Sequence, residues 1–266
     1  MGERVSRWLV LLVTGCSLLV WGCASVPPPR TAAPLRSPAG MHAAPLAGPI
    51  RTVVVDAGHG GKDPGTQHFG LKEKHLALDI ARRLRAQLQE SGLRVLMTRE
   101  SDQFISLSGR PGLANRNQAD LFVSVHINAN HNQRVSGIEV YYPRESVVSA
   151  SAHWPPAVAP HEVGVASMTV KQVLWDLVLG RTRAQSRRLA SSICRSMRGE
   201  LQVSCRGPKS ARFVVLREAW MPAVLVEVGY VSNETEARRL NNAAYREAAA
   251  ESIAEGIVSY IREFGV

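Results

Sequence analysis

Apolar side chains recur along most of the chain in two patterns, and these patterns predict its secondary structure. Short continuous apolar runs rich in β-branched residues predict buried strands, here over residues 51–56, 93–98, 120–128, 137–142, 213–216 and 223–228. Apolar residues three and four positions apart predict helices with one buried face, here over residues 73–91, 170–178, 183–201 and 245–264. Because strands and helices alternate, we expect one α/β domain with a mostly parallel central sheet and helices on both faces.

Two helix ends carry local signals. Gly92 follows the first predicted helix, and glycine commonly ends a helix in the left-handed conformation. Ser232 and Asn233 precede Glu234 and Glu236. Small polar residues cap helices and acidic residues suit the first turn, so a further helix is expected to begin there.

The first 49 residues differ from the rest of the chain. A basic start precedes an apolar run over residues 8–21, which is too short to span a membrane comfortably and is typical of an export signal. The run ends in LVWGCAS at residues 19–25, which resembles the lipobox of bacterial lipoproteins, where the cysteine carries the lipid. We predict a signal peptide over residues 1–22 and a lipid on Cys23. A lipid on Cys16 and a plain signal peptide are the alternatives.

The segment after this cysteine has the composition of a tether. Residues 23–49 are rich in proline and alanine, which favours an extended chain over a packed core. We therefore place the folded catalytic domain at residues 50–266. The residues after Cys23 lack the aspartate that retains lipoproteins at the inner membrane. The lipobox resemblance thus implies a periplasmic protein anchored at the outer membrane.

Composition narrows the range of partners. The formal net charge is +10, the isoelectric point is near 10.0, and 45% of the 266 residues are hydrophobic. The hydrophobic share is sufficient for a full core, and the positive charge favours an acidic partner. Nucleic acid, anionic lipid and the carboxylate-bearing cell wall all fit that charge, but the export signal argues against nucleic acid.

Four titratable side chains stand at predicted strand ends or at a helix start. His59 lies in a glycine-rich loop after the first strand, while His126 and Glu227 lie near the ends of two other strands. Ligands of α/β folds bind at such strand ends. Glu227 interrupts an apolar run, and a buried carboxylate needs a metal, a cation or a proton. Glu73 begins a helix, where the helix dipole alone would explain it.

Both histidines also have a structural explanation. The loop around His59 lacks the Gly-Lys-Ser/Thr of a phosphate loop, but it fits a plain glycine turn. A single histidine near the end of an apolar strand, such as His126, is more often a hydrogen-bonded core residue than a ligand.

Taken together, these positions resemble the zinc-dependent N-acetylmuramoyl-L-alanine amidases of the type-3 domain family. The resemblance spans residues 52 to 264 and rests on separated motifs in the same order, at residues 53–65 (VVVDAGHGGKDPG), 70–74 (GLKEK), 115–116 (NR), 119–129 (ADLFVSVHINA), 137–142 (GIEVYY) and 221–233 (MPAVLVEVGYVSN). It implies that His59, Glu73 and His126 bind Zn²⁺ and that Glu227 is the catalytic carboxylate. It also implies a peptidoglycan substrate.

The chemistry of this donor set agrees with the resemblance. Two imidazoles and one carboxylate leave the fourth position of a tetrahedral zinc site open for water, and zinc lowers the pKa of that water to about 7. Glu227 would take a proton during attack on the amide between the lactyl group of muramic acid and L-alanine. It would then pass this proton to the departing amine. We expect a hydrolase of cell-wall remodelling or daughter-cell separation.

Two other functions stay open on the sequence alone. A peptidoglycan-binding lipoprotein without activity would not need a general base, and the four intact residues argue against it. A zinc amidase of small acylated amino acids or peptides is disfavoured by the tether and the basic composition, which suit a polymeric substrate.

Two further features each have two interpretations. Cys194 and Cys205 form a disulfide in an oxidising compartment, or they are buried thiols. Residues 147–179 exceed what a minimal amidase domain needs. Their helix packs its apolar stripe on the domain, which we favour, or it covers the zinc through Glu162 or Asp176. In the second case a LytM-domain activator displaces the helix, as it does in some relatives.

The family pattern also sets expectations away from the centre. Glycines and a proline at residues 109–112 weaken the helix expected before Asn115, so its start is expected to shift. Three histidines lie off the family positions and are expected at the surface or beside the site: His68, His75 and His131.

Overall fold

The computed structural model describes residues 50–144 and 168–264, which belong to one compact unit. The predicted signal peptide, both candidate lipidation sites at Cys16 and Cys23, and the predicted tether lie outside the described residues. The first part of the segment predicted to cover or pack on the domain, including Glu162, also lies outside them.

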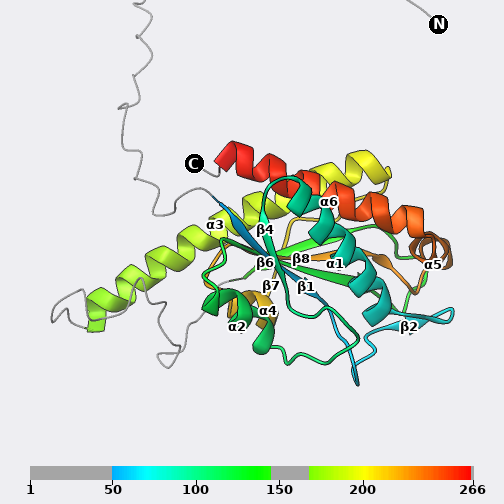
Figure 1. The fold of residues 1–266 in the computed structure, drawn as a ribbon, viewed down its shortest axis with the longest axis horizontal. Helices are drawn as coiled ribbons and strands as arrows, with labels where there is room; N and C mark the ends of the chain where they lie inside the picture. The colour runs from blue at the N-terminus through cyan, green and yellow to red at the C-terminus, as the bar shows by residue number, and fades with distance from the viewer. Residues whose placement is uncertain (1–49, 145–167, 265–266) are drawn as a thin grey trace, which may run out of the picture. The chain divides into compact units, whose positions relative to one another are not determined.

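A six-stranded sheet forms the centre of the domain, in the order β4-β1-β5-β8-β6-β7 (Figure 1). The β4, β1, β5 and β8 strands are parallel to their neighbours, β6 runs antiparallel to β8, and β7 is parallel to β6. The mostly parallel sheet expected from the sequence is therefore confirmed. The strands are β1 Thr52–Ala57, β4 Arg94–Met97, β5 Leu121–Asn128, β6 Glu139–Pro143, β7 Lys209–Ala211 and β8 Ala223–Tyr230. A separate two-stranded hairpin joins β2 Gln67–His68 to β3 Leu71–Lys72.

Helices cover both faces of this sheet, as predicted. Val53 and Val55 of β1 face the larger core, which the sheet forms with α1, α3, α5 and α6. Val54 faces the smaller core on the other side, together with Phe122 of β5 and residues of α2 and α4 (Figure 1). Strands covered on both faces have no polar side to alternate with, which explains their continuous apolar runs. The helices are α1 Glu73–Glu90, α2 Gly109–Arg116, α3 Met168–Leu201, α4 Val214–Arg217, α5 Glu234–Asn241 and α6 Ala243–Phe264.

The two helices predicted at residues 170–178 and 183–201 form one continuous helix, α3. The prediction of a break around Gly180 was wrong, because a glycine inside a helix costs only about 1 kcal/mol and does not by itself end the helix. Leu177 is 65% exposed, so this member of the predicted apolar stripe does not pack on the domain. The side chain of Asp176 lies outside the described part of this helix.

The apolar run at residues 213–216 was predicted as a strand, but it forms the short helix α4. The backbone carbonyl of Phe213 accepts hydrogen bonds from the N–H groups of Leu216 and Arg217, at 3.1 and 2.9 Å. Val215 and Leu216 are buried in the smaller core. A run of four apolar residues shows neither helical nor strand periodicity, so its type could not be assigned from the pattern.

The helix start expected near Ser232 and Asn233 is confirmed, because the Asn233 side chain caps α5 by accepting the N–H of Glu236 at 3.1 Å. The α2 helix begins at Gly109 and therefore includes the glycines and the proline that were expected to weaken its start. Pro111 lies in its first turn, where proline is tolerated because the N–H there has no partner within the helix. A disulfide links Cys194 of α3 to Cys205. Within the described ranges, no helix is long and apolar enough to cross a membrane.

Candidate metal centre and active site

The parallel strands β1, β5 and β8 bring three of the four candidate residues to one edge of the sheet. His59 lies just beyond the end of β1, His126 lies near the end of β5, and Glu227 lies opposite His126 in the register between β5 and β8. Glu73, the first residue of α1, completes the group from the adjacent helix. The fold therefore brings these four side chains, which are far apart in the sequence, to one end of the sheet.

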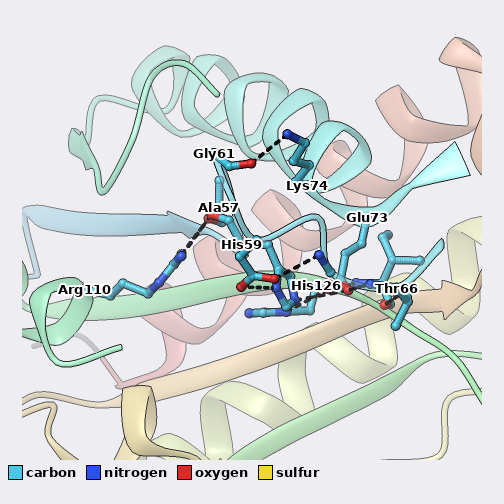
Figure 2. Close-up of polar contacts among 12 residues, drawn as sticks. Ala57, His59, Gly61, Thr66, Glu73, Lys74, Arg110 and His126 are labelled. Atoms are coloured by element: carbon cyan, nitrogen blue, oxygen red, sulfur yellow. Dashed lines mark hydrogen bonds and ion pairs between the residues drawn. The ribbon is translucent and has the colours of Figure 1, made fainter. Parts of the chain in front are cut away.

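Glu73 lies between the two histidines (Figure 2). Its Oε2 lies 3.1 Å from Nε2 of His59, and its Oε1 lies 2.9 Å from Nδ1 of His126. The backbone N–H groups of Thr66 and Ile127 also donate to this carboxylate, at 2.9 and 3.0 Å. Burial opposes ionisation here, but the hydrogen bonds from His126 and His59 outweigh it and hold the pKa of Glu73 well below its usual range.

The three side chains offer ligand atoms that all lie within 4.8 Å of one another. The rings of His59 and His126 are 5.0 Å apart, with an angle of 79° between their planes. Two imidazole nitrogens and one carboxylate oxygen at this spacing suit a catalytic zinc site, which has three protein ligands and an open fourth position. The residues present therefore fit the metal that the sequence resemblance implies.

Asp63 orients the first of these histidines. Its Oδ2 lies 2.7 Å from Nδ1 of His59, and a carboxylate on one ring nitrogen fixes the tautomer and directs the other nitrogen towards a metal. Burial lowers the pKa of His59, but its contacts with Glu73 and Asp63 outweigh that effect and raise it overall. Sequence reasoning did not assign Asp63 a role. Its spacing of four residues after His59, inside the quoted motif, is a signal that could have indicated one.

Two positions beside the candidate ligands have room only for glycine. A Cβ atom at Gly58 would lie 2.4 Å from Cε1 of His126, and one at Gly65 would lie 2.5 Å from Oε2 of Glu73. Any larger side chain at either position would therefore displace a candidate ligand. The glycine-rich loop is thus explained by the geometry of the cluster as well as by the turn.

Glu227 differs from Glu73 in having an unpaired oxygen. Its Oε2 is buried and has no hydrogen-bond partner among the residues that the structure describes. Burial, and secondarily the negative charges of Glu73 and Glu139, raise the pKa of the Glu227 carboxyl well above its usual range. An unsatisfied buried carboxyl oxygen is unfavourable unless a cation or a proton compensates it, so this atom also fits a metal centre with bound water.

Glu139 lies on the other side of Glu227, as its register partner on β6. The Lys209 ammonium donates to Oε1 of Glu139 at 2.6 Å, and the Tyr141 hydroxyl donates to Oε2. Burial works against the charged form, but these bonds, the one from Lys209 foremost, lower the pKa of Glu139. Glu139 is within the quoted motif at residues 137–142, yet the strand pattern alone could not show that it adjoins Glu227.

A groove of about 540 Å³ opens onto this cluster. His59, His126 and Glu227 line it, and its walls are mostly apolar, with contributions from Phe104, Ile105, Leu107, Phe213, Val214, Val215 and Leu225. The Arg212 side chain also lines the groove and makes no hydrogen bond or ion pair with residues 50–144 or 168–264. The groove thus combines an apolar wall with a cation that has no partner in the described residues, and it also includes the two histidines of the candidate metal site.

The three other histidines of the described residues lie outside this groove, as expected. His75 and His131 are exposed, and His68 is half-buried in the hairpin. His68 and His131 line a different hollow of about 380 Å³. In the described part of the chain, His59, Glu73 and His126 form the only group of three potential ligands close enough to hold one ion.

Comparison with known proteins agrees with this geometry. Residues 53–259 match the family model described as N-acetylmuramoyl-L-alanine amidase. The chain is 36% identical to the N-acetylmuramoyl-L-alanine amidase AmiA of Escherichia coli over 223 residues, which cover 80% of this chain and 77% of that protein. Among solved structures it resembles the amidase AmiC2 of Nostoc punctiforme, with a TM-score of 0.62, 32% identity and coverage of 81% of this chain and 99% of that one.

A second solved structure, an N-acetylmuramoyl-L-alanine amidase from Clostridium difficile 630, gives a TM-score of 0.64 and 31% identity, and covers 81% of this chain and 98% of that one. The family resemblance inferred from the separated motifs is thereby confirmed. With a matching sheet, a cluster of two histidines and a glutamate at its edge, and a family match over most of its length, the chain belongs to the N-acetylmuramoyl-L-alanine amidase family.

Proposed function

We propose that this amidase cleaves the bond between the lactyl group of N-acetylmuramic acid and L-alanine with one zinc ion, held by His59, Glu73 and His126, and with Glu227 as the proton carrier. The observation that carries this proposal is the unpaired Oε2 of Glu227 beside three ligand atoms within 4.8 Å of one another. A binding protein without activity would have no use for an unpaired buried carboxyl at this position.

The chain's own residues supply orientation and proton transfer. When bound at such a site, zinc polarises the scissile carbonyl and makes water a nucleophile at neutral pH. Asp63 holds the His59 ring, and Glu73 is held as a carboxylate by four hydrogen-bonding groups. Glu227 accepts a proton from the attacking water and then donates it to the alanine nitrogen as the amide breaks.

The surroundings of Glu227 suit both proton steps. Burial and neighbouring carboxylates raise its pKa in the metal-free protein, whereas a nearby divalent cation acts in the opposite direction. Glu139 stays ionised beside it because Lys209 and Tyr141 donate to it. This fixed negative charge favours the protonated form of Glu227, which is the form that protonates the leaving amine.

The groove fits the chemistry on both sides of the scissile bond. Its apolar walls, including Phe104 and Phe213, suit the lactyl, N-acetyl and alanine methyl groups. Arg212 lines the same groove without a partner in the described part of the chain, and an arginine readily pairs with a carboxylate of the stem peptide. The basic composition of the chain suits an acidic polymer in the same way.

Analysis of the products and of the metal content tests the proposal directly. Mass spectrometry of digested peptidoglycan should show glycan strands freed of peptides that begin with L-alanine. Elemental analysis of the purified protein should find one zinc per chain, and His126→Ala should lose it because one of three protein ligands is removed. A fully active metal-free enzyme, or cleavage at another bond, would contradict the proposed mechanism.

Export, lipid attachment at Cys23 and a periplasmic site at the outer membrane are part of the same proposal. Their support is the basic start, the short apolar run and the LVWGCAS sequence at residues 19–25. A lipid tether would keep the enzyme near its polymeric substrate.

The proposal also includes regulation by a LytM-domain activator. It applies if residues 147–179 cover the metal, and not if their helix only packs on the domain. The exposure of Leu177 removes one residue from the stripe that would pack on the domain. If this segment covers the metal, deleting residues 147–179 should raise wall hydrolysis severalfold in the absence of any partner. An unchanged or lower rate in a variant with the wild-type circular dichroism spectrum would leave these residues a structural role only.

A further inference from the structure

Arg99 is a buried arginine that lies between two segments carrying candidate metal ligands. It follows β4 in the sequence, and only 1% of its surface is exposed. Its Nε donates to the carbonyl oxygen of Ala57 at 2.9 Å, and its Nη2 donates to the carbonyl oxygens of Gly58 at 2.7 Å and Lys74 at 2.8 Å. Nη1 donates to the carbonyl of Ser101 at 3.1 Å.

The residues that accept these bonds flank the ligands directly. Ala57 and Gly58 precede His59, and Lys74 follows Glu73. One planar guanidinium therefore fixes the backbone on the approach to His59 relative to the backbone just after Glu73. A guanidinium holds its donors in a rigid fork, whereas a lysine ammonium is a single point on a flexible chain.

His59 needs such support from its surroundings. Its φ of 58° lies in the left-handed region, which is unfavourable for a residue with a side chain because the Cβ atom crowds the following carbonyl oxygen. Conformations of this kind persist only where neighbouring groups hold them. Arg110 also holds this loop, since it donates to the carbonyl oxygen of Ala57 at 2.7 Å (Figure 2) and to that of His59 at 2.9 Å.

Arg110 has a carboxylate counter-ion, whereas Arg99 has none in the described residues. Arg110 pairs with the buried carboxylate of Asp56 at 2.8 Å. Arg99 donates to carbonyl oxygens alone, with no carboxylate among its partners in residues 50–144 and 168–264. Burial, followed by repulsion from Arg110, lowers the pKa of Arg99. A buried cation without a counter-ion is an expensive way to stabilise a fold, which points to a role in the site.

The segment after Arg99 adds a second connection between the same two regions. Oδ1 of Asp102 accepts the N–H of Gly61 at 2.7 Å, and its Oδ2 pairs with Lys74 at 2.6 Å. The Lys74 ammonium donates in turn to the carbonyl of Gly61 at 2.9 Å (Figure 2). Residues 99–102 thus join the His59 loop to the start of α1 at two separate places.

We propose that Arg99 is a positioning residue that sets the separation of His59 and Glu73 before the metal binds, and so raises the affinity for it. The inference rests on the proposed function, because it concerns the same metal. A preformed spacing means that less ordering of the loop is needed when the ion arrives. Partners that orient metal ligands typically change metal affinity by about 10–100-fold when they are replaced.

Zinc affinity of the full chain, measured by competition with a fluorescent chelator, tests the role. Arg99→Lys keeps the charge but lacks the rigid fork of donors that spans the carbonyls of Ala57, Gly58 and Lys74, so its affinity should fall about 10–100-fold. Asp102→Asn, at a more exposed position, should give a smaller loss. The matched control is Arg85→Lys, because Arg85 lies about three turns further along α1 and pairs with the exposed Glu100, and it has no hydrogen bond or ion pair to Ala57, Gly58 or Lys74 in the described residues. Its affinity should equal that of the wild type.

Hydrogen exchange of the metal-free protein provides the second readout. The amides of Gly58 to Gly61 should exchange faster in Arg99→Lys than in Arg85→Lys, because the loop is held less firmly. Loop exchange can be measured even if the wild-type protein takes up no zinc. Failure to take up zinc would contradict the proposed function, but not the role of Arg99 in holding the loop. Unchanged loop exchange and unchanged zinc affinity in both Arg99→Lys and Asp102→Asn, even with a lower unfolding temperature, would overturn the proposal and leave Arg99 a structural residue.

Discussion

At the scale of single residues, substitution of Glu227 distinguishes metal binding from hydrolysis of the amide. It lies opposite His126 on the neighbouring strand, and its buried Oε2 is unpaired within the described chain. Glu227→Gln should keep the fold and the metal, because no candidate ligand is removed. Wall hydrolysis, measured by release of dye from labelled peptidoglycan, should fall about 10²–10⁴-fold, since an amide cannot carry the proton.

Glu218→Gln serves as the control for this substitution, because Glu218 pairs with Arg217 outside the groove. It should retain the wild-type rate. Near-wild-type hydrolysis by Glu227→Gln, with its zinc content unchanged, would show that another residue carries the proton.

Much of the candidate site could be predicted from the sequence, and the limits of that prediction are physical. His59, His126 and Glu227 each interrupt a pattern, either as a polar residue in an apolar strand or as a histidine in a glycine loop. Arg99 does not interrupt one, because an arginine after a short strand looks like any surface residue. Its burial depends on three segments, 57–58, 74 and 99–101, that meet only in the folded chain.

At the scale of elements, an ion-pair cluster joins α1 to α6. Asp79 of α1 accepts from Arg83 at 2.9 Å and from Arg246 of α6 at 2.5 Å, and Arg83 also pairs with Glu247 of α6. Burial opposes the charge on Asp79, but the bonds from Arg83 and Arg246 outweigh this and lower its pKa. The cluster lies on the helix layer, away from the groove.

The pH dependence of stability follows from the direction of that shift. Because the folded-state pKa of Asp79 is below its unfolded value of about 3.9, its contribution is fully present above that value and is lost as the pH falls through the folded-state pKa. Asp79→Asn should therefore lower the free energy of unfolding by about 1 kcal/mol or less at pH 7, and by less at pH 3. Urea unfolding at both pH values measures this, with Glu90→Gln as an exposed control on the same helix. An equal loss at both pH values would contradict it.

Element types were predictable where the chain repeats a pattern for long enough. The predictions for β1, β5, β8, α1 and α6 are confirmed because each has many buried positions on a regular spacing. The α4 helix has four residues and β7 has three, two of them exposed, so neither is long enough for a repeating apolar pattern to show its type. The continuity of α3 through Gly180 depends on the neighbouring turns rather than on the glycine itself.

At the scale of the whole molecule, the prediction of a lipid anchor concerns residues outside the described part. Cys23→Ala should abolish incorporation of a labelled fatty acid and move the enzyme from the membrane fraction to the soluble periplasmic fraction, because the acylated residue is gone. Labelling followed by fractionation measures both effects. A label kept in Cys23→Ala but lost in Cys16→Ala would place the lipid on the other cysteine.

The disulfide between Cys194 and Cys205 is compatible with that destination. It joins α3 to the segment before β7 across a sequence separation of 11 residues. Disulfides form and persist chiefly in oxidising compartments such as the periplasm. The sequence left two interpretations for these cysteines, and the disulfide is the one that suits the proposed export.

The position of β8 has a consequence for how an active enzyme is made. All three candidate ligands lie within the first 126 residues, whereas Glu227 arrives a hundred residues later on the strand that joins β5 to β6. On the proposed mechanism, a chain released by the ribosome before residue 223 would carry the three candidate ligands without the proton carrier, and no strand would join β6 and β7 to β1 and β5. Termination or proteolysis before Glu227 would therefore leave a fragment without hydrolytic activity, so errors of synthesis upstream of β8 would not release an active hydrolase.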